Sequence, residues 1–206
     1  MIIDISWPIS ESVTEYKDRS SVVVKQLSCV TERGVSETLI TMHSHTGTHI
    51  DAPAHFVRDG ATIDQVSLSQ VVGRCRVIDM TGVTTAITAA DLTNQSVQKN
   101  DIVLFKTKNS AHAPTDLFDA AFIYLAADGA QLLADAGVLA VGIDYLGIER
   151  NQPGHETHNV LLANGVTIIE GLRLGHVAAG DYFLCCLPLS LPGLDAAPAR
   201  AVLLPA

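Results

Sequence analysis

The stretch that decides how this chain is interpreted is Met42-His43-Ser44-His45-Thr46-Gly47-Thr48-His49-Ile50-Asp51-Ala52-Pro53-Ala54-His55-Phe56. Four of the eight histidines of the chain fall inside it, together with an aspartate. Imidazole and carboxylate groups are the usual protein ligands of zinc and manganese. A solvated histidine-rich loop without metal is the alternative, whereas an internal cluster interrupted by apolar residues excludes an expression tag. The stretch therefore predicts a site for a divalent metal, Zn or Mn.

The spacing within this stretch favours a catalytic metal site. Gly47 permits a sharp turn between His45 and His49, and Asp51 lies on the same side of an extended segment as His49. Three ligands leave coordination positions open for water and substrate, which is typical of catalytic rather than structural metal sites. His55 is either a further ligand or the group that transfers a proton, because histidine titrates near neutrality. Gly47 and Pro53 predict a loop or an irregular strand end here.

Outward from this stretch, apolar β-rich runs alternate with short helical patterns. Several of the apolar runs are continuous, as expected of strands covered on both faces. Strands are predicted at 2–5, 21–30, 35–42, 76–80, 101–107, 138–144, 166–170, 182–189 and 201–204. Helices are predicted from the capping box at Thr88 to about Val97, over Asp128–Ala136 before Gly137, and over His158–Ala163. This order predicts a single α/β domain over residues 1–206 with a mixed sheet.

Composition excludes several classes of protein. The chain has 206 residues, of which 48% are hydrophobic and 17% charged, too apolar for a disordered chain. Its formal charge of −9 argues against nucleic acid as a partner. No apolar run is long enough for a membrane span, and the N-terminus lacks a signal peptide, so we expect a cytoplasmic protein without a membrane partner. In such a reducing compartment the four cysteines are expected to be free thiols: Cys29, Cys75, Cys185 and Cys186.

The run from His45 to His55 resembles the HxGTHxDxPxH signature of the cyclase-like metal-dependent hydrolases, a family that includes bacterial kynurenine formamidase and isatin hydrolase. Weaker similarities to that family extend over most of the chain. They lie at residues 3–6, 141–144, 158–162, 168–172 and 187–201. The resemblance implies a swivelling β/β/α fold, a homodimer or homotetramer, and one or two metal ions per subunit.

The resemblance also implies a role for each matching residue. One metal is expected on His45, His49 and Asp51. A second is expected on Asp51, His158 and Glu170, with Asp51 bridging, and His55 is the expected catalytic base and acid. Without the resemblance, Glu170 is more simply interpreted as an exposed acid at a strand end, because glutamate is rarely buried unpaired. His155, three residues before His158, competes with it as a ligand. The remaining histidines, His43, His112, His155 and His176, are expected at the surface or behind the ligands.

The early loop departs from the family pattern. The family often has a proline-glycine-aspartate turn there, whereas this chain has Tyr16-Lys17-Asp18. This loop is expected to shape the substrate pocket, so the departure concerns the substrate rather than the metal. Aromatic residues make up only 5% of the chain, which leaves Trp7 and Tyr16 as candidates for contacting the substrate, with packing at a surface as the alternative for each.

These observations predict a metal-dependent hydrolase of a small amide. From the resemblance, an arylformamide such as N-formylkynurenine, an intermediate of tryptophan catabolism, is the first expected substrate, and an isatin-like lactam comes next. A cyclase or dehydratase on the same metal site, acting on a polyketide-like substrate, and a non-enzymatic metal-binding protein stay open as alternatives. A serine hydrolase is disfavoured because no G-x-S-x-G motif occurs.

Overall fold

The most apolar runs of the sequence form the centre of one large sheet in the computed structural model, which describes residues 1–206. Neighbouring strands are parallel in the order β5 (Val72–Asp79), β7 (Ile102–Lys106), β9 (Ala140–Ile143) and β10 (Thr167–Glu170). In β7, Ile102 and Leu104 enter one hydrophobic core, while Val103 and Phe105 enter a second core on the opposite face. Burial of both faces explains why this run does not alternate with polar residues.

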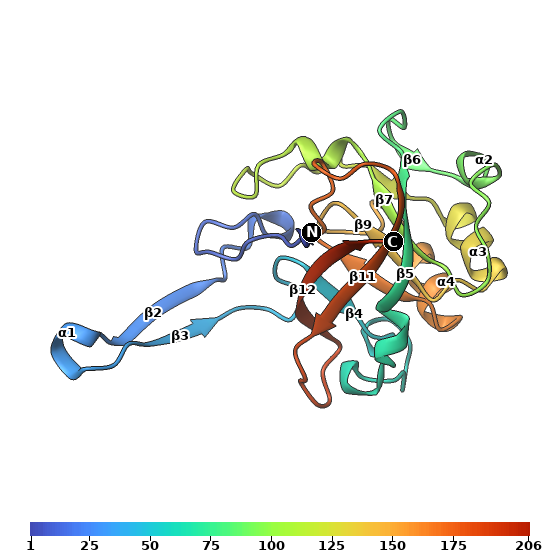
Figure 1. Ribbon diagram of the computed structural model, residues 1–206. Coiled ribbons are helices and arrows are strands. Elements are labelled where there is room, and N and C mark those ends of the chain that lie inside the picture. Colours follow the sequence, from blue (N-terminus) through green and yellow to red (C-terminus); the bar gives the residue numbers. More distant parts are fainter.

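Antiparallel strands complete the sheet and close it. They are β1 (Ile3–Asp4), β4 (His49–Asp51), β11 (Gly180–Pro188) and β12 (Ala196–Pro205). Strand β4 pairs with β10 on one side and with β12 on the other, so the eight-stranded sheet meets itself there. The prediction of an α/β fold with a mixed sheet is confirmed. Pairing of β1 with β12 brings the two termini close together (Figure 1).

Short helices cover the outer face of the parallel strands (Figure 1). They are α2 (Ala89–Leu92), α3 (Ala127–Ala136) and α4 (Glu156–Ala163), beside a small sheet of β6 (Ala86–Ile87) and β8 (Tyr124–Leu125). Five single 3₁₀ turns lie at Tyr16–Asp18, Pro53–His55, Ile63–Gln65, Leu68–Gln70 and Lys108–Ala111. None of the helices combines the length and the apolarity that crossing a membrane requires.

The sequence located the helices better than it delimited them. The capping box is present, since the Thr88 backbone N–H donates to the Asp91 carboxylate at 2.8 Å. That helix nevertheless ends at Leu92 instead of near Val97, and Ser96 already has a left-handed φ of 50°. The predicted end of the helix before Gly137 is confirmed, because Gly137 caps α3 with a φ of 73°. In the histidine stretch, where a loop or an irregular strand end was expected, the three-residue strand β4 lies between turns.

A hairpin arm projects from the body and takes no part in the large sheet (Figure 1). It consists of β2 (Val23–Ser28), the one-turn α1 (Val30–Arg33) and β3 (Glu37–Thr41). These runs were expected among the strands of the sheet, but they pair only with each other. Large apolar side chains are exposed on the arm: Val23, Val24, Leu27, Val30, Val35, Leu39 and Ile40. The homodimer or homotetramer stays a prediction.

One glycine locks the histidine stretch against β10. Gly171 follows Glu170 directly, and its carbonyl accepts a hydrogen bond from the Thr48 hydroxyl at 2.5 Å. Its φ is 69°, and a Cβ at this position would lie 2.2 Å from the carbonyl oxygen of Gly47. Only glycine permits so close an approach of the two backbones.

We therefore expect Gly171→Ala to destabilise the fold far more than Gly165→Ala. Gly165 has nearly the same φ, 73°, but open space around it, so alanine there meets only the left-handed backbone cost of about 1–2 kcal/mol. At Gly171 the backbone clash adds about 1–3 kcal/mol. Urea denaturation measures both variants. Equal losses at the two positions would contradict the close approach.

Candidate metal centre

Strand β4 presents its two polar side chains to one side and its apolar side chain to the other. Ile50 enters the hydrophobic core, while His49 and Asp51 are 1% and 0% exposed on the opposite face. The register with β10 places Glu170 directly across from His49. Since side chains alternate along a strand, the sequence spacing of His49 and Asp51 puts both beside Glu170. Three polar groups thus meet where the sheet closes.

The distances between these groups are those of a ligand cluster. His49 Nε2 lies 3.5 Å from Asp51 Oδ1 and 3.3 Å from Glu170 Oε2. His158, from α4, places its Nε2 at 3.4 Å from Glu170 Oε1 and 3.7 Å from Asp51 Oδ2. His45 Nδ1 lies 3.0 Å from Asp51 Oδ1. The structure therefore brings the other four ligands expected from the sequence around the Asp51 carboxylate.

The buried atoms of this cluster lack the hydrogen bonds that their burial demands. Both carboxylate oxygens of Asp51 and the Nε2 atom of His49 are inaccessible to water and make no hydrogen bond. The other ring nitrogen of His49, Nδ1, donates to the Gly47 carbonyl at 2.9 Å, which leaves the Nε2 lone pair free. Buried polar groups are normally satisfied, and a bound cation would satisfy these. The nitrogen and oxygen donor set fits Zn or Mn.

The electrostatics of the cluster favour bound positive charge. Burial raises the pKa of Asp51 and of Glu170, but the surrounding histidines outweigh burial and leave both pKa values lowered. Burial likewise opposes protonation of His45, yet the Asp51 and Asp195 carboxylates raise its pKa to about 9. A divalent ion at Asp51 would take over the compensation that protonated histidines supply.

His55 and Asp195 lie beside this cluster. The Asp195 carboxylate is 2.8 Å from His45 Nε2 and 3.5 Å from His55 Nδ1, so it contacts both rings. Burial lowers the pKa of His55. A neutral imidazole can accept a proton, as a general base must. Asp195 belongs to the C-terminal run that resembled the family, but the sequence offered no sign that it meets these histidines.

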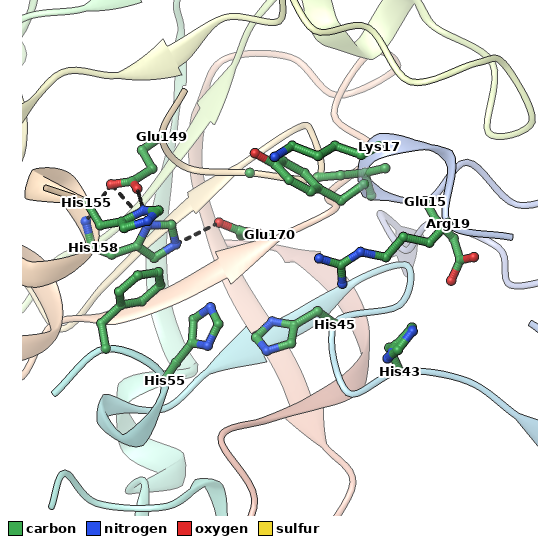
Figure 2. Close-up of a pocket in the computed structure, with 14 residues that line it drawn as sticks. Glu15, Lys17, Arg19, His43, His45, His55, Glu149, His155, His158 and Glu170 are labelled. Atoms are coloured by element: carbon green, nitrogen blue, oxygen red, sulfur yellow. Dashed lines mark hydrogen bonds and ion pairs between the residues drawn. The ribbon is translucent and has the colours of Figure 1, made fainter. Parts of the chain in front are cut away.

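Glu149 is a second site residue that sequence reasoning missed. Its carboxylate is buried, lies 3.1 Å from His158 Nδ1, and accepts a hydrogen bond from the His158 backbone N–H at 3.2 Å. It also contacts His155 Nδ1 (Figure 2). A carboxylate on the far nitrogen of a ligand fixes the orientation of the ring and makes it a better ligand. His158 follows Glu149 by nine positions, across a loop and the first turn of α4, so no local periodicity links them.

His45, His55, Glu149, His158 and Glu170 line one cavity of about 320 Å³, a size suited to a small molecule. Figure 2 shows Glu149, His155, His158 and His55 at one end and Lys17, Arg19 and His43 toward the other. The cavity is lined by Glu15, Tyr16, Lys17, Arg19, His43, His45, His55, Phe56, Leu146, Gly147, Glu149, His155, His158 and Glu170. Its walls come from three distant parts of the chain.

The remaining expected residues fall in different places. Tyr16 lines the cavity, but Trp7 does not, since it is 2% exposed in a separate core cluster and donates to the Pro114 carbonyl at 3.1 Å. Trp7 therefore packs inside the molecule, and not at a surface as its alternative specified. His112 pairs with Asp119 at 3.3 Å, away from the cavity lining. His43 and His155 line the cavity, whereas His176 is exposed elsewhere.

Comparison with known proteins gives consistent similarities. Residues 3–150 match the model of the Cyclase family, described as "Putative cyclase". A potential metal-dependent hydrolase with cyclase activity is 46% identical, with a TM-score of 0.90, over 98% of this chain and 96% of that one. A predicted metal-dependent hydrolase from Bacillus stearothermophilus is 45% identical, with a TM-score of 0.89, over 98% and 97%. Isatin hydrolase A from Ralstonia solanacearum shares the fold at 19% identity, with a TM-score of 0.86, over 100% and 92%.

Asp51→Asn is expected to abolish binding of the divalent ion, because Asp51 is the one group that all the other ligands surround. Metal content by elemental analysis and thermal stability with and without added Zn or Mn would measure the loss. Ligand at 100 times its Kd stabilises a folded protein by about 2.7 kcal/mol, and this increment should vanish. His112→Gln, outside the cavity, is the control. An Asn variant that keeps the full complement of metal would contradict the assignment.

Glu149→Gln should weaken metal binding about tenfold or more while leaving the ligands in place. The amide keeps the volume of the carboxylate but removes the charge that faces His158 and His155. Competition with a chromophoric chelator measures the dissociation constant. Glu156→Gln is a matched control, because Glu156 is exposed in the first turn of α4 and belongs to no metal cluster. Equal affinities in the two variants would exclude a role for Glu149 in orienting His158.

Proposed function

We propose that this chain, which belongs to the Cyclase family, is a divalent-metal-dependent hydrolase. The observation that carries the proposal is the buried cluster of His49, Asp51 and Glu170, whose donor atoms lie within 4.8 Å of one another with several of them unpartnered. Relatives at 46% and 45% identity, named as metal-dependent hydrolases, support it. A metal-binding protein without activity is the alternative, but a cavity beside the cluster favours an enzyme.

The proposed ligands are those of the resemblance. His45, His49 and Asp51 would hold one ion, and Asp51, His158 and Glu170 a second where two are bound. When bound, such an ion would polarise a carbonyl and lower the pKa of a bound water from its value in bulk toward about 7. Glu170 also accepts a hydrogen bond from the Ile148 backbone N–H at 2.6 Å, which fixes its carboxylate toward the cluster.

His55 is the proposed proton carrier. Its ring lies at the cavity wall, close to His45 at 4.2 Å between ring centroids, and Asp195 contacts its Nδ1. In the neutral form it accepts the proton of the attacking water. It then donates that proton to the nitrogen of the cleaved amide, so that the amine leaves uncharged. Asp195 orients the ring and stabilises its protonated form.

The proposed substrate is a small amide, first an arylformamide such as N-formylkynurenine. The cavity volume of about 320 Å³ accommodates one aromatic ring with a short substituent. An isatin-like lactam is the second candidate, since isatin hydrolases share the fold. A cyclase or dehydratase reaction is the third, because the 46% identical relative is named with cyclase activity.

Hydrolysis of formanilide and of isatin should require a divalent ion, cease after chelation and return with Zn or Mn. In oxygen-18 water, the acid product of a hydrolase carries the label, whereas a cyclase or dehydratase incorporates none. Full turnover by metal-free protein would exclude the metal-dependent mechanism.

His55→Ala should keep its metal and lose about 10²–10⁴-fold in turnover, the usual contribution of general acid–base catalysis. Metal content is measured on the same preparation. His176→Ala, a surface histidine, is the control. Unchanged turnover in His55→Ala would remove this residue from the mechanism.

A further inference from the structure

We propose that the substrate of this cavity carries a carboxylate, which binds to Lys17 and Arg19 at the rim remote from His55. The proposal rests on the proposed function and narrows its substrate to anionic amides. Both cations belong to the early loop in which this chain departs from its family. Figure 2 shows Lys17 and Arg19 together on one side of the cavity, with the Arg19 side chain extended toward Glu170 and His45.

The backbone of the loop that carries these side chains is held in a strained conformation. Lys17, Asp18 and Ser20 have left-handed φ angles of 58°, 52° and 52°, although none is glycine. The Asp18 carboxylate accepts a hydrogen bond from the Phe118 backbone N–H at 2.8 Å, which ties the loop to the body. Strained backbone of this kind persists only where surrounding contacts determine it, and it concentrates at functional sites.

The two cations have no anionic partner within the chain. The arginine–carboxylate ion pairs of this protein are Arg76–Asp181 and Arg200–Asp4, both far from the cavity lining. Lys17 Nζ and the Arg19 guanidinium instead lie over the Tyr16 ring, at 5.3 and 6.0 Å from its centroid. Tyr16 packs in turn against Phe118 at 4.8 Å. The ring therefore supports both charges at the cavity wall.

The carboxylates that line the same cavity are already engaged. Glu15 accepts hydrogen bonds from the backbone N–H and the hydroxyl of Ser21. Glu149 faces His155 and His158, and Glu170 faces His49 and His158. Because Ser21 is uncharged, the negative charge of Glu15 remains, but Lys17 and Arg19 outnumber it and leave the rim with a net positive charge that an anionic group on the substrate would complement.

The shape of the cavity separates the two ends of such a substrate. Phe56 and Leu146 supply the apolar wall of the cavity, and the Phe56 ring lies 4.4 Å from the rings of both His55 and His158. A carboxylate at the rim would leave an aromatic ring against this wall and an amide beside His55. The chemistry that fits is an aryl amide with a carboxylate on the side away from the scissile bond.

The test compares formanilide with its 3- and 4-carboxylates, which differ from it only by the charged group. We expect kcat/KM to be about tenfold higher for the better carboxylate, mainly through KM, because exposed charge pairs contribute modestly. Arg19→Gln and Lys17→Gln should each reduce this ratio, and the double variant should abolish it. Because the ratio of kcat/KM for the carboxylate to kcat/KM for formanilide is compared, a loss of activity that affects both substrates equally cancels. Arg33→Gln on the arm makes the same change in net charge and is the control.

Binding of 4-aminobenzoate and of aniline, measured by calorimetry, makes the outcome independent of turnover. Tighter binding of the carboxylate that is lost in the double variant supports the rim site even if no amide is hydrolysed, which would overturn only the proposed function. Hydrolysis of all three amides with equal kcat/KM, and equal binding of the two ligands, would overturn the rim site while leaving the hydrolase intact.

Discussion

The site in this structure depends on two carboxylates that are buried on adjacent strands and require positive charge beside them. Asp51 on β4 and Glu170 on β10 lie in a dry region, where like charges repel and each ion loses its hydration. Such an arrangement is stable only with positive charge beside it. His45, His49 and His158 surround the pair, and the same geometry fits a divalent ion. The demand for a cation thus follows from where the sheet closes.

The closure of the sheet at β4 creates this demand. Because β4 pairs with both β10 and β12, its orientation in the sheet is fixed, and His49 and Asp51 are held on one face beside Glu170. Gly171 allows the backbones of β10 and the histidine stretch to approach within contact, which brings Glu170 to the ligands. The floor of the cavity is therefore built on strands, the most rigid part of the molecule, while loops form its rim. In the proposed function, the residues of the floor hold the metal, whereas the loop residues of the rim select the substrate.

Much of the fold could be predicted from the sequence, because the patterns that start, end and pack its helices and strands are local. Continuous apolar runs predicted the central strands, a capping box began α2, and Gly137 ended α3. The arm at 23–41 shows the limit of that reasoning. Its residues have strand composition, yet its apolar side chains are exposed and its strands pair only with each other. Composition does not reveal whether a strand finds a place in the main sheet.

The sequence by itself determined the donor set of the candidate centre and the alternation that puts His49 and Asp51 on one face, because neighbours in a chain obey short-range geometry. Only the tertiary structure decided that Asp195 contacts His45, that Glu149 contacts His158, and that Trp7 is packed away from the cavity. These contacts join residues through strand pairing and loop closure. Burial and long-range charge compensation arise only when the chain has folded, so no local pattern records them.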